Sequence, residues 1–177
     1  MRIPFVLLML VSLFACDKYK ERISSVELIT SDLKKDSLFK GLVKLTFNSI
    51  PESMLQDSLA FLVLPVQAIC PSCREKTVDS IVKYQHHLPD KHFIIISANG
   101  GRKLINSFFK EEHKRLPVIE GKLFLDSTNM AHRYELYEDK PTMYYTYRGK
   151  AYKKVSSMPA TVRKDLHQFF SGNSDLQ

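Results

Sequence analysis

Hydrophobic residues alternate along the chain between short continuous apolar runs and stripes with helical spacing. Segments 59–64 and 93–97 are apolar at almost every position, which is typical of strands that are buried on both faces. Over 72–88, apolar side chains recur every three to four residues and predict a helix that ends before Pro89. Strands that alternate with helices predict an α/β domain in which a sheet lies between two helical layers.

The same criteria predict the remaining elements. Partial period-two alternation and short apolar runs predict further strands at 23–29, 42–47, 122–125, 142–147 and 151–155. Apolar stripes predict helices around 104–109, ending at Pro117, and at 130–137 and 162–170. Residues 23–58 are therefore expected to form an N-terminal extension made of strands. Residues 59–172 are expected to form the main domain.

The first 16 residues have the pattern of an export signal. One early positive charge is followed by an apolar stretch of signal-peptide length, shorter than the ~20 residues of a membrane-spanning helix. Leu13-Phe14-Ala15-Cys16 resembles the lipobox of bacterial lipoproteins, in which the signal is removed before the cysteine and the cysteine sulfur carries lipid. The resemblance implies a signal peptide at 1–15, a lipidated Cys16 and a tether through residue 22. An ordinary secretory signal, or an uncleaved N-terminal anchor, is the alternative.

Charge and cysteine content restrict the class of protein to which the chain can belong. The formal net charge is +7 at pH 7. Basic residues alternate with acidic ones, as in Lys110–Arg115, which favours charges dispersed over a solvated surface. No nucleic-acid-binding motif is present, so we expect no nucleic-acid partner. With only two cysteines after Cys16, the chain is not a disulfide scaffold and has to bury a hydrophobic core.

Cys70-Pro71-Ser72-Cys73 is the motif with the most specific chemistry. It lies between a predicted strand and a predicted helix, and two thiols at this spacing are typical of a redox pair. The start of a helix presents unpaired N–H groups and the positive end of the helix dipole. Both stabilise a thiolate, and the thiolate is the species that attacks disulfides. The motif therefore predicts thiol–disulfide exchange.

Two cysteines at this spacing also occur in metal sites and in structural disulfides. A closed zinc site requires four ligands, and we interpret the histidines as surface residues, so no metal site is assigned. A Cu(I) ion accepts two thiolates, which leaves a lipid-anchored copper chaperone as an alternative. A non-catalytic interaction module is another. A purely structural disulfide is disfavoured, because closing so short a loop constrains the unfolded chain little.

The order of these elements resembles a known fold. A strand, Cys-x-x-Cys, a helix, a strand, a helix, a late Pro-Thr at 141–142, a hairpin and a final helix resemble thioredoxin. The closest resemblance is to the membrane-tethered, thioredoxin-like thiol–disulfide oxidoreductases of the bacterial envelope, and it covers residues 59–170. It implies an α/β, three-layer, thioredoxin-like domain with helices on both faces of the sheet.

The resemblance also implies roles for the motif. Cys70 would be the exposed nucleophile and Cys73 the buried resolving thiol, with no cofactor other than their redox-active disulfide. The partners would be protein thiols and disulfides, together with an electron donor or acceptor in the membrane. The protein would face the periplasm from a bacterial membrane. We expect it to act as a reductase, because the tethered subgroup mostly reduces.

Four further residues are expected to contact the substrate. Pro71 and Ser72 lie between the two cysteines. Pro141 would be the cis-proline that faces the pair, and Lys140 before it would offer its backbone to a substrate peptide. The Lys140 ammonium group would either lower the pKa of the Cys70 thiol or extend into solvent.

The sequence departs from the thioredoxin pattern at three positions. Ile69 replaces the tryptophan that usually precedes the first cysteine, and Leu64 replaces a buried aspartate that assists the resolving thiol. Lys76 stands where the envelope subgroup often has glutamate. These changes bear on the rate and direction of exchange and leave its basic chemistry intact.

The lipobox yields the first testable prediction. Replacing Cys16 with Ser should release the protein from the membrane fraction, because it removes the lipid attachment point. Cell fractionation and incorporation of a labelled fatty acid measure this. A Cys16→Ser protein that stays fully membrane-bound, with no label taken up by the wild type, would contradict lipidation.

Overall fold

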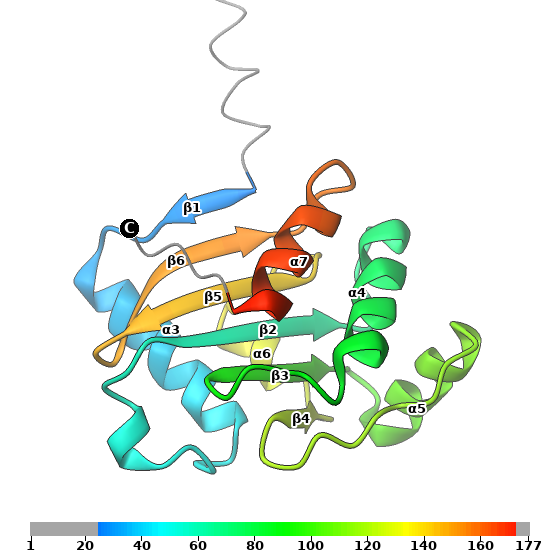
Figure 1. Ribbon diagram of the computed structural model, residues 1–177, viewed down its shortest axis with the longest axis horizontal. Coiled ribbons are helices and arrows are strands. Elements are labelled where there is room, and N and C mark those ends of the chain that lie inside the picture. The colour runs from blue at the N-terminus through cyan, green and yellow to red at the C-terminus, as the bar shows by residue number, and fades with distance from the viewer. Residues whose placement is uncertain (1–24, 173–177) are drawn as a thin grey trace, which may run out of the picture.

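A six-stranded mixed sheet forms the centre of the molecule (Figure 1), in the computed structural model that describes residues 25–172. The strand order is β1-β6-β5-β2-β3-β4. β2, β3 and β4 are mutually parallel, whereas β5, β6 and β1 pair antiparallel. The strands are β1 (Val26–Leu28), β2 (Leu59–Pro65), β3 (His92–Ser97), β4 (Leu123–Asp126), β5 (Thr142–Tyr147) and β6 (Lys150–Ser156).

Strand β2 lies in the middle of the sheet and all seven of its residues are buried. It pairs with β3 on one side and with β5 on the other. Its side chains alternate between two hydrophobic cores: Leu62 and Leu64 belong to one, and Phe61 and Val63 to the other. This is why the sequence of β2 is apolar throughout and does not alternate with polar residues.

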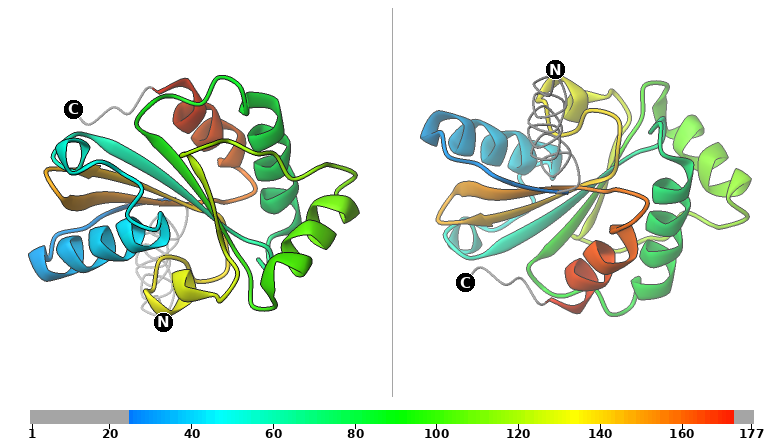
Figure 2. Two further views of the ribbon diagram at one scale, coloured as in Figure 1. Left: turned by 90° about the horizontal axis from the view of Figure 1, so that it is seen from below. Right: turned by 90° about the horizontal axis from the view of Figure 1, so that it is seen from above.

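The two cores are covered by different helices (Figure 2). Those on one face are α4 (Pro71–Tyr84), α5 (Gly101–Glu111) and α7 (Val162–Ser171). Those on the other face are α3 (Asp32–Leu45) and α6 (Met130–Arg133). A short 3-10 helix, η1 (Glu52–Met54), precedes β2. The predicted α/β class, with a sheet between two helical layers, is confirmed.

The predicted strand at 42–47 is wrong, because these residues mostly belong to helix α3. Ser31 caps the helix by accepting a hydrogen bond from the Lys34 amide at 3.4 Å. The buried positions Leu38, Leu42 and Leu45 follow helical spacing and pack beneath the sheet. The partial alternation over 42–47 covers too few residues to separate a strand from the end of a helix. Residues 25–58 therefore contain a short strand, a long helix and a 3-10 turn.

The structure also differs from the sequence prediction in the boundaries of some elements and in the burial of one histidine. Strand β1 has three residues, α5 ends at Glu111, and α6 ends at Arg133. The interpretation of His92 as a surface residue is wrong: it is 6% exposed, and its ring lies 4.9 Å from that of Phe169. Burial lowers the pKa of His92 to about 4, so the imidazole is neutral at pH 7.

The predicted signal peptide, Cys16 and the tether lie outside the described residues. Within residues 25–172, no helix combines the length and the hydrophobicity needed to cross a bilayer.

Helix α3 provides a direct test of the corrected fold. Leu42 is fully buried, whereas Leu33 on the same helix is 85% exposed. Leu42→Ala should lower the free energy of unfolding by about 2–5 kcal/mol, because it leaves a cavity in the core. Leu33→Ala should change it by less than about 0.5 kcal/mol. Urea denaturation of both variants measures this, and equal losses would contradict the packing of α3.

Candidate active site

The cysteine pair forms the beginning of helix α4. Cys70 is the N-cap residue with an extended backbone, and Pro71 follows at the first helical position. Proline suits that position because its ring fixes φ and its missing N–H has no helical partner there. Cys70 and Cys73 form a disulfide with their Cα atoms 5.3 Å apart. One helical turn thus brings the two sulfurs together.

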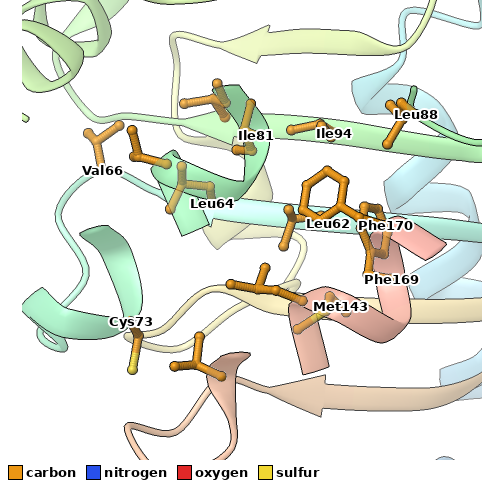
Figure 3. Packing of buried hydrophobic residues seen from close by; sticks show 14 of the residues in the cluster. Leu62, Leu64, Val66, Cys73, Ile81, Leu88, Ile94, Met143, Phe169 and Phe170 are labelled. Atoms are coloured by element: carbon orange, nitrogen blue, oxygen red, sulfur yellow. The ribbon is translucent and has the colours of Figure 1, made fainter. Parts of the chain in front are cut away.

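The two sulfurs differ in exposure. Cys70 is half-buried, whereas Cys73 is fully buried at the edge of the core formed by α4, α7 and β2 (Figure 3). A protein disulfide therefore has access to Cys70 only. This asymmetry matches the roles expected for an attacking and a resolving thiol.

Three segments distant in sequence meet at this pair. The Ile69 amide donates a hydrogen bond to the Asp139 carbonyl at 2.9 Å, and the Ser157 amide donates to the Pro141 carbonyl at 2.8 Å. The Ser157 carbonyl oxygen lies 3.8 Å from the Cys73 sulfur. Backbone hydrogen bonds therefore fix the loop before the cysteines, the start of β5 and the end of β6 against one another.

Pro141 is buried at this junction, but its expected cis peptide bond is absent. Within residues 25–172 every peptide bond is trans, which is the ordinary preference for X–Pro by about 0.5–1 kcal/mol. The Thr142 hydroxyl donates to the Lys140 carbonyl at 3.0 Å. Lys140 itself is half-buried. Backbone hydrogen bonds of Asp139 and Pro141 connect this segment to Ile69 and Ser157, which neighbour the cysteine pair, with a peptide geometry that differs from the expectation.

Ser72 lies on the exposed side of the pair. Its hydroxyl oxygen is 3.8 Å from the Cys70 sulfur, and Pro71 beside it is exposed. The first turn of α4 contains no acidic residue. In the reduced protein, the Ser72 hydroxyl and the helix N-terminus can both stabilise a Cys70 thiolate, and no carboxylate in that turn opposes them.

Arg74 is a structural residue of the site that sequence reasoning did not identify. Its Nη1 donates to the Val66 carbonyl at 3.2 Å, and its Nη2 lies 3.8 Å from Glu112. Its guanidinium lies over the Phe108 ring at 5.1 Å. Arg74 therefore holds α4 against α5 and against the loop that leads to Cys70. No local sequence signal indicates this, because its partners come from other elements.

The departures from the thioredoxin pattern have clear structural places. Leu64 is fully buried in β2, where it supplies no proton acceptor, and Ile69 is 74% exposed next to Cys70. Ile69 therefore places an apolar side chain on the surface beside the reactive sulfur. Over residues 25–172, no cluster of three or more His, Cys, Asp or Glu side chains is arranged to hold a metal ion.

Comparison with models of protein families finds no match, and comparison with curated proteins finds none either. Three solved structures illustrate what the chain is similar to. A secreted Mycobacterium tuberculosis disulfide oxidoreductase, described as homologous to DsbE of E. coli, is 10% identical over 68% of this chain and 84% of its own, with a TM-score of 0.41. StoA from Bacillus subtilis is 16% identical over 63% and 83%, with a TM-score of 0.40.

The third structure, apo Sco1 from Thermus thermophilus, is 12% identical over 70% of this chain and 83% of its own, with a TM-score of 0.39. Likenesses of this size do not assign an activity.

Lys140 provides a test of the electrostatics of the site. Lys140→Thr should raise the pKa of the Cys70 thiol and lower its thiolate fraction at pH 7, by up to about fivefold, because it removes a nearby positive charge. Thiolate absorbance, measured with Cys73 replaced by Ser in both proteins, reports this pKa. Lys40→Thr, on the exposed side of α3, is the control. An unchanged Cys70 pKa would mean that the ammonium group extends into solvent and has no electrostatic role.

Proposed function

We propose that this protein is a thiol–disulfide oxidoreductase of the bacterial cell envelope that acts as a reductase on protein disulfides. One observation carries the proposal: a Cys70–Cys73 disulfide at a helix N-terminus, with one sulfur accessible and the other buried. A structural crosslink has no need of an accessible sulfur, whereas exchange requires one.

The proposed reaction has two steps. The Cys70 thiolate attacks one sulfur of a substrate disulfide, so a mixed disulfide forms and the other substrate sulfur leaves as a thiolate. The Cys73 thiolate then attacks the Cys70 sulfur, closes the Cys70–Cys73 bond and releases the second substrate thiol. Two electrons pass to the substrate. The pair is positioned for the second step, because the two Cα atoms are only 5.3 Å apart.

The substrate polypeptide would lie on the exposed rim of the site. Pro71 and Ser72 form the side next to the Cys70 sulfur, and Ile69 adds an exposed apolar contact. Lys140 belongs to a second segment, which is connected to the same loop through the hydrogen bond from the Ile69 amide to the Asp139 carbonyl, and Pro141 is buried behind it. A chain that contacts both sides would be held with its disulfide against Cys70.

The reductase direction is supported by what surrounds Cys70. The Pro71-Ser72 pair places a neutral hydroxyl near the sulfur, where a cationic side chain would stabilise the thiolate much more strongly. Less stabilisation of the thiolate by the residues between the cysteines gives a more reducing pair, nearer to thioredoxin at about −270 mV than to the strong periplasmic oxidant at about −120 mV, whereas stabilisation of the thiolate by Lys140 acts in the opposite direction. Electrons would come from a donor in the membrane, to which the protein is attached through a lipid on Cys16.

Insulin reduction provides the test of this activity. With dithiothreitol as the electron source, the wild type should accelerate the precipitation of reduced insulin, and Cys70→Ser should abolish the acceleration. Cys73→Ser should instead accumulate mixed disulfides in cells, because the first step proceeds and the second cannot. Non-reducing gels detect these adducts.

Two results would contradict the proposal. Stoichiometric Cu(I) binding without any thiol exchange would indicate a copper chaperone instead. Mixed disulfides trapped by Cys70→Ser and not by Cys73→Ser would reverse the roles of the two sulfurs.

A further inference from the structure

Ser157 carries a buried hydroxyl that has no role in the fold. The residue is 0% exposed and follows the last residue of β6. Its amide donates to the Pro141 carbonyl, but its side-chain oxygen has no hydrogen-bond partner. Leaving a buried hydroxyl unpaired destabilises the folded state. Such groups are uncommon in folded proteins, and a redox or catalytic role is one reason for keeping them.

The same residue contacts the buried sulfur of the redox pair. The Ser157 carbonyl oxygen lies 3.8 Å from the Cys73 sulfur. In the disulfide that sulfur has no hydrogen, so the contact is not a hydrogen bond. Reduction with two electrons and two protons breaks the Cys70–Cys73 bond and gives Cys73 an S–H group. The Ser157 carbonyl oxygen is placed to accept a hydrogen bond from that group. The environment of Ser157 thus changes with the redox state.

Ionisation of Cys73 changes the kind of hydrogen-bond partner that its sulfur needs. A thiolate is repelled by a carbonyl oxygen and needs a donor, and a serine hydroxyl can donate. Rotation about the Cα–Cβ bond moves the Ser157 hydroxyl among three staggered positions. The Thr77 hydroxyl, one turn further along α4, already donates to the Cys73 carbonyl at 2.6 Å. Leu64 supplies no polar group.

We propose that the Ser157 hydroxyl donates a hydrogen bond to the Cys73 sulfur once the pair is reduced, and that it stabilises the thiolate that resolves the mixed disulfide. This inference rests on the proposed exchange function. In the step concerned, Cys73 loses its proton to water and attacks the Cys70 sulfur. The bond between Cys70 and the substrate breaks, and the electron pair leaves with the substrate sulfur, which takes up a proton.

A hydrogen bond made only in the reduced state shifts the redox equilibrium. Ser157→Ala removes it, and it also removes the unpaired hydroxyl from the oxidised state, so both effects favour the disulfide. We expect the equilibrium with glutathione to move about tenfold towards the oxidised pair, which is about 30 mV. Resolution of a preformed mixed disulfide should slow by a similar factor, whereas the first attack by Cys70 should not change.

The experiment compares four variants in both redox states. Ser157→Ala and Ser157→Gly remove the hydroxyl, Ser157→Thr retains it, and Ser156→Ala is the control at the half-buried neighbouring position. Equilibrium with a glutathione buffer, the rate of resolution and the melting temperatures of the oxidised and reduced forms are measured. Ser157→Ala and Ser157→Gly should raise the melting temperature of the oxidised form relative to that of the reduced form. Thr, if it folds, should resemble the wild type.

A purely structural role predicts a different pattern. Ser157→Ala would then change both melting temperatures equally and leave the glutathione equilibrium and the rate of resolution unchanged, which would overturn the inference. Failure of the proposed function is distinguishable, because a wild type without exchange on insulin would still have a measurable glutathione equilibrium. In that case a shift in Ser157→Ala supports the hydrogen bond, and no shift rejects it.

Discussion

The pairing of β5 with β2 is the constraint on which the site depends. Because β5 runs antiparallel to β2, with Thr142 opposite Val63, the start of β5 lies at the edge where β2 leads to the cysteines. The pairing of β6 with β5 then brings Ser156 opposite Thr142, so that Ser157 lies next to Cys73. The backbone contacts around the buried sulfur follow from this registration of three strands.

Burial makes one sulfur accessible and the other inaccessible. α4 begins at the sheet edge and packs against the core, so Cys70 at its cap stays accessible while Cys73, one turn later, is enclosed. Arg74 strengthens this arrangement by bridging to the Val66 carbonyl and to Glu112. The accessible sulfur has a hydroxyl and a helix N-terminus beside it, and the enclosed sulfur has a carbonyl. The difference in exposure is what the proposed roles of attacking and resolving thiol require.

Local sequence patterns predicted the central strands well and failed where tertiary contacts decide. Strands β2 and β3 could be predicted from their own sequences, because strands buried on both faces are apolar at nearly every position. Residues 42–47 were misassigned, because the last turn of α3 alternates by chance as a strand would. Pro141 was expected to be cis on the strength of a resemblance, and its peptide bond is trans. Ser157 and Arg74 were missed, since their partners lie in other elements and no local motif marks them.

The most direct test of this account is the rate at which each thiol of the reduced protein is alkylated as a function of pH, measured by mass spectrometry. The account predicts that Cys70 reacts much faster than Cys73 and that its reactivity titrates below the ordinary thiol pKa of about 8.5, because the helix N-terminus stabilises its thiolate. Equal rates at the two sulfurs, faster modification of Cys73, or a Cys70 titration at or above the ordinary value would contradict it.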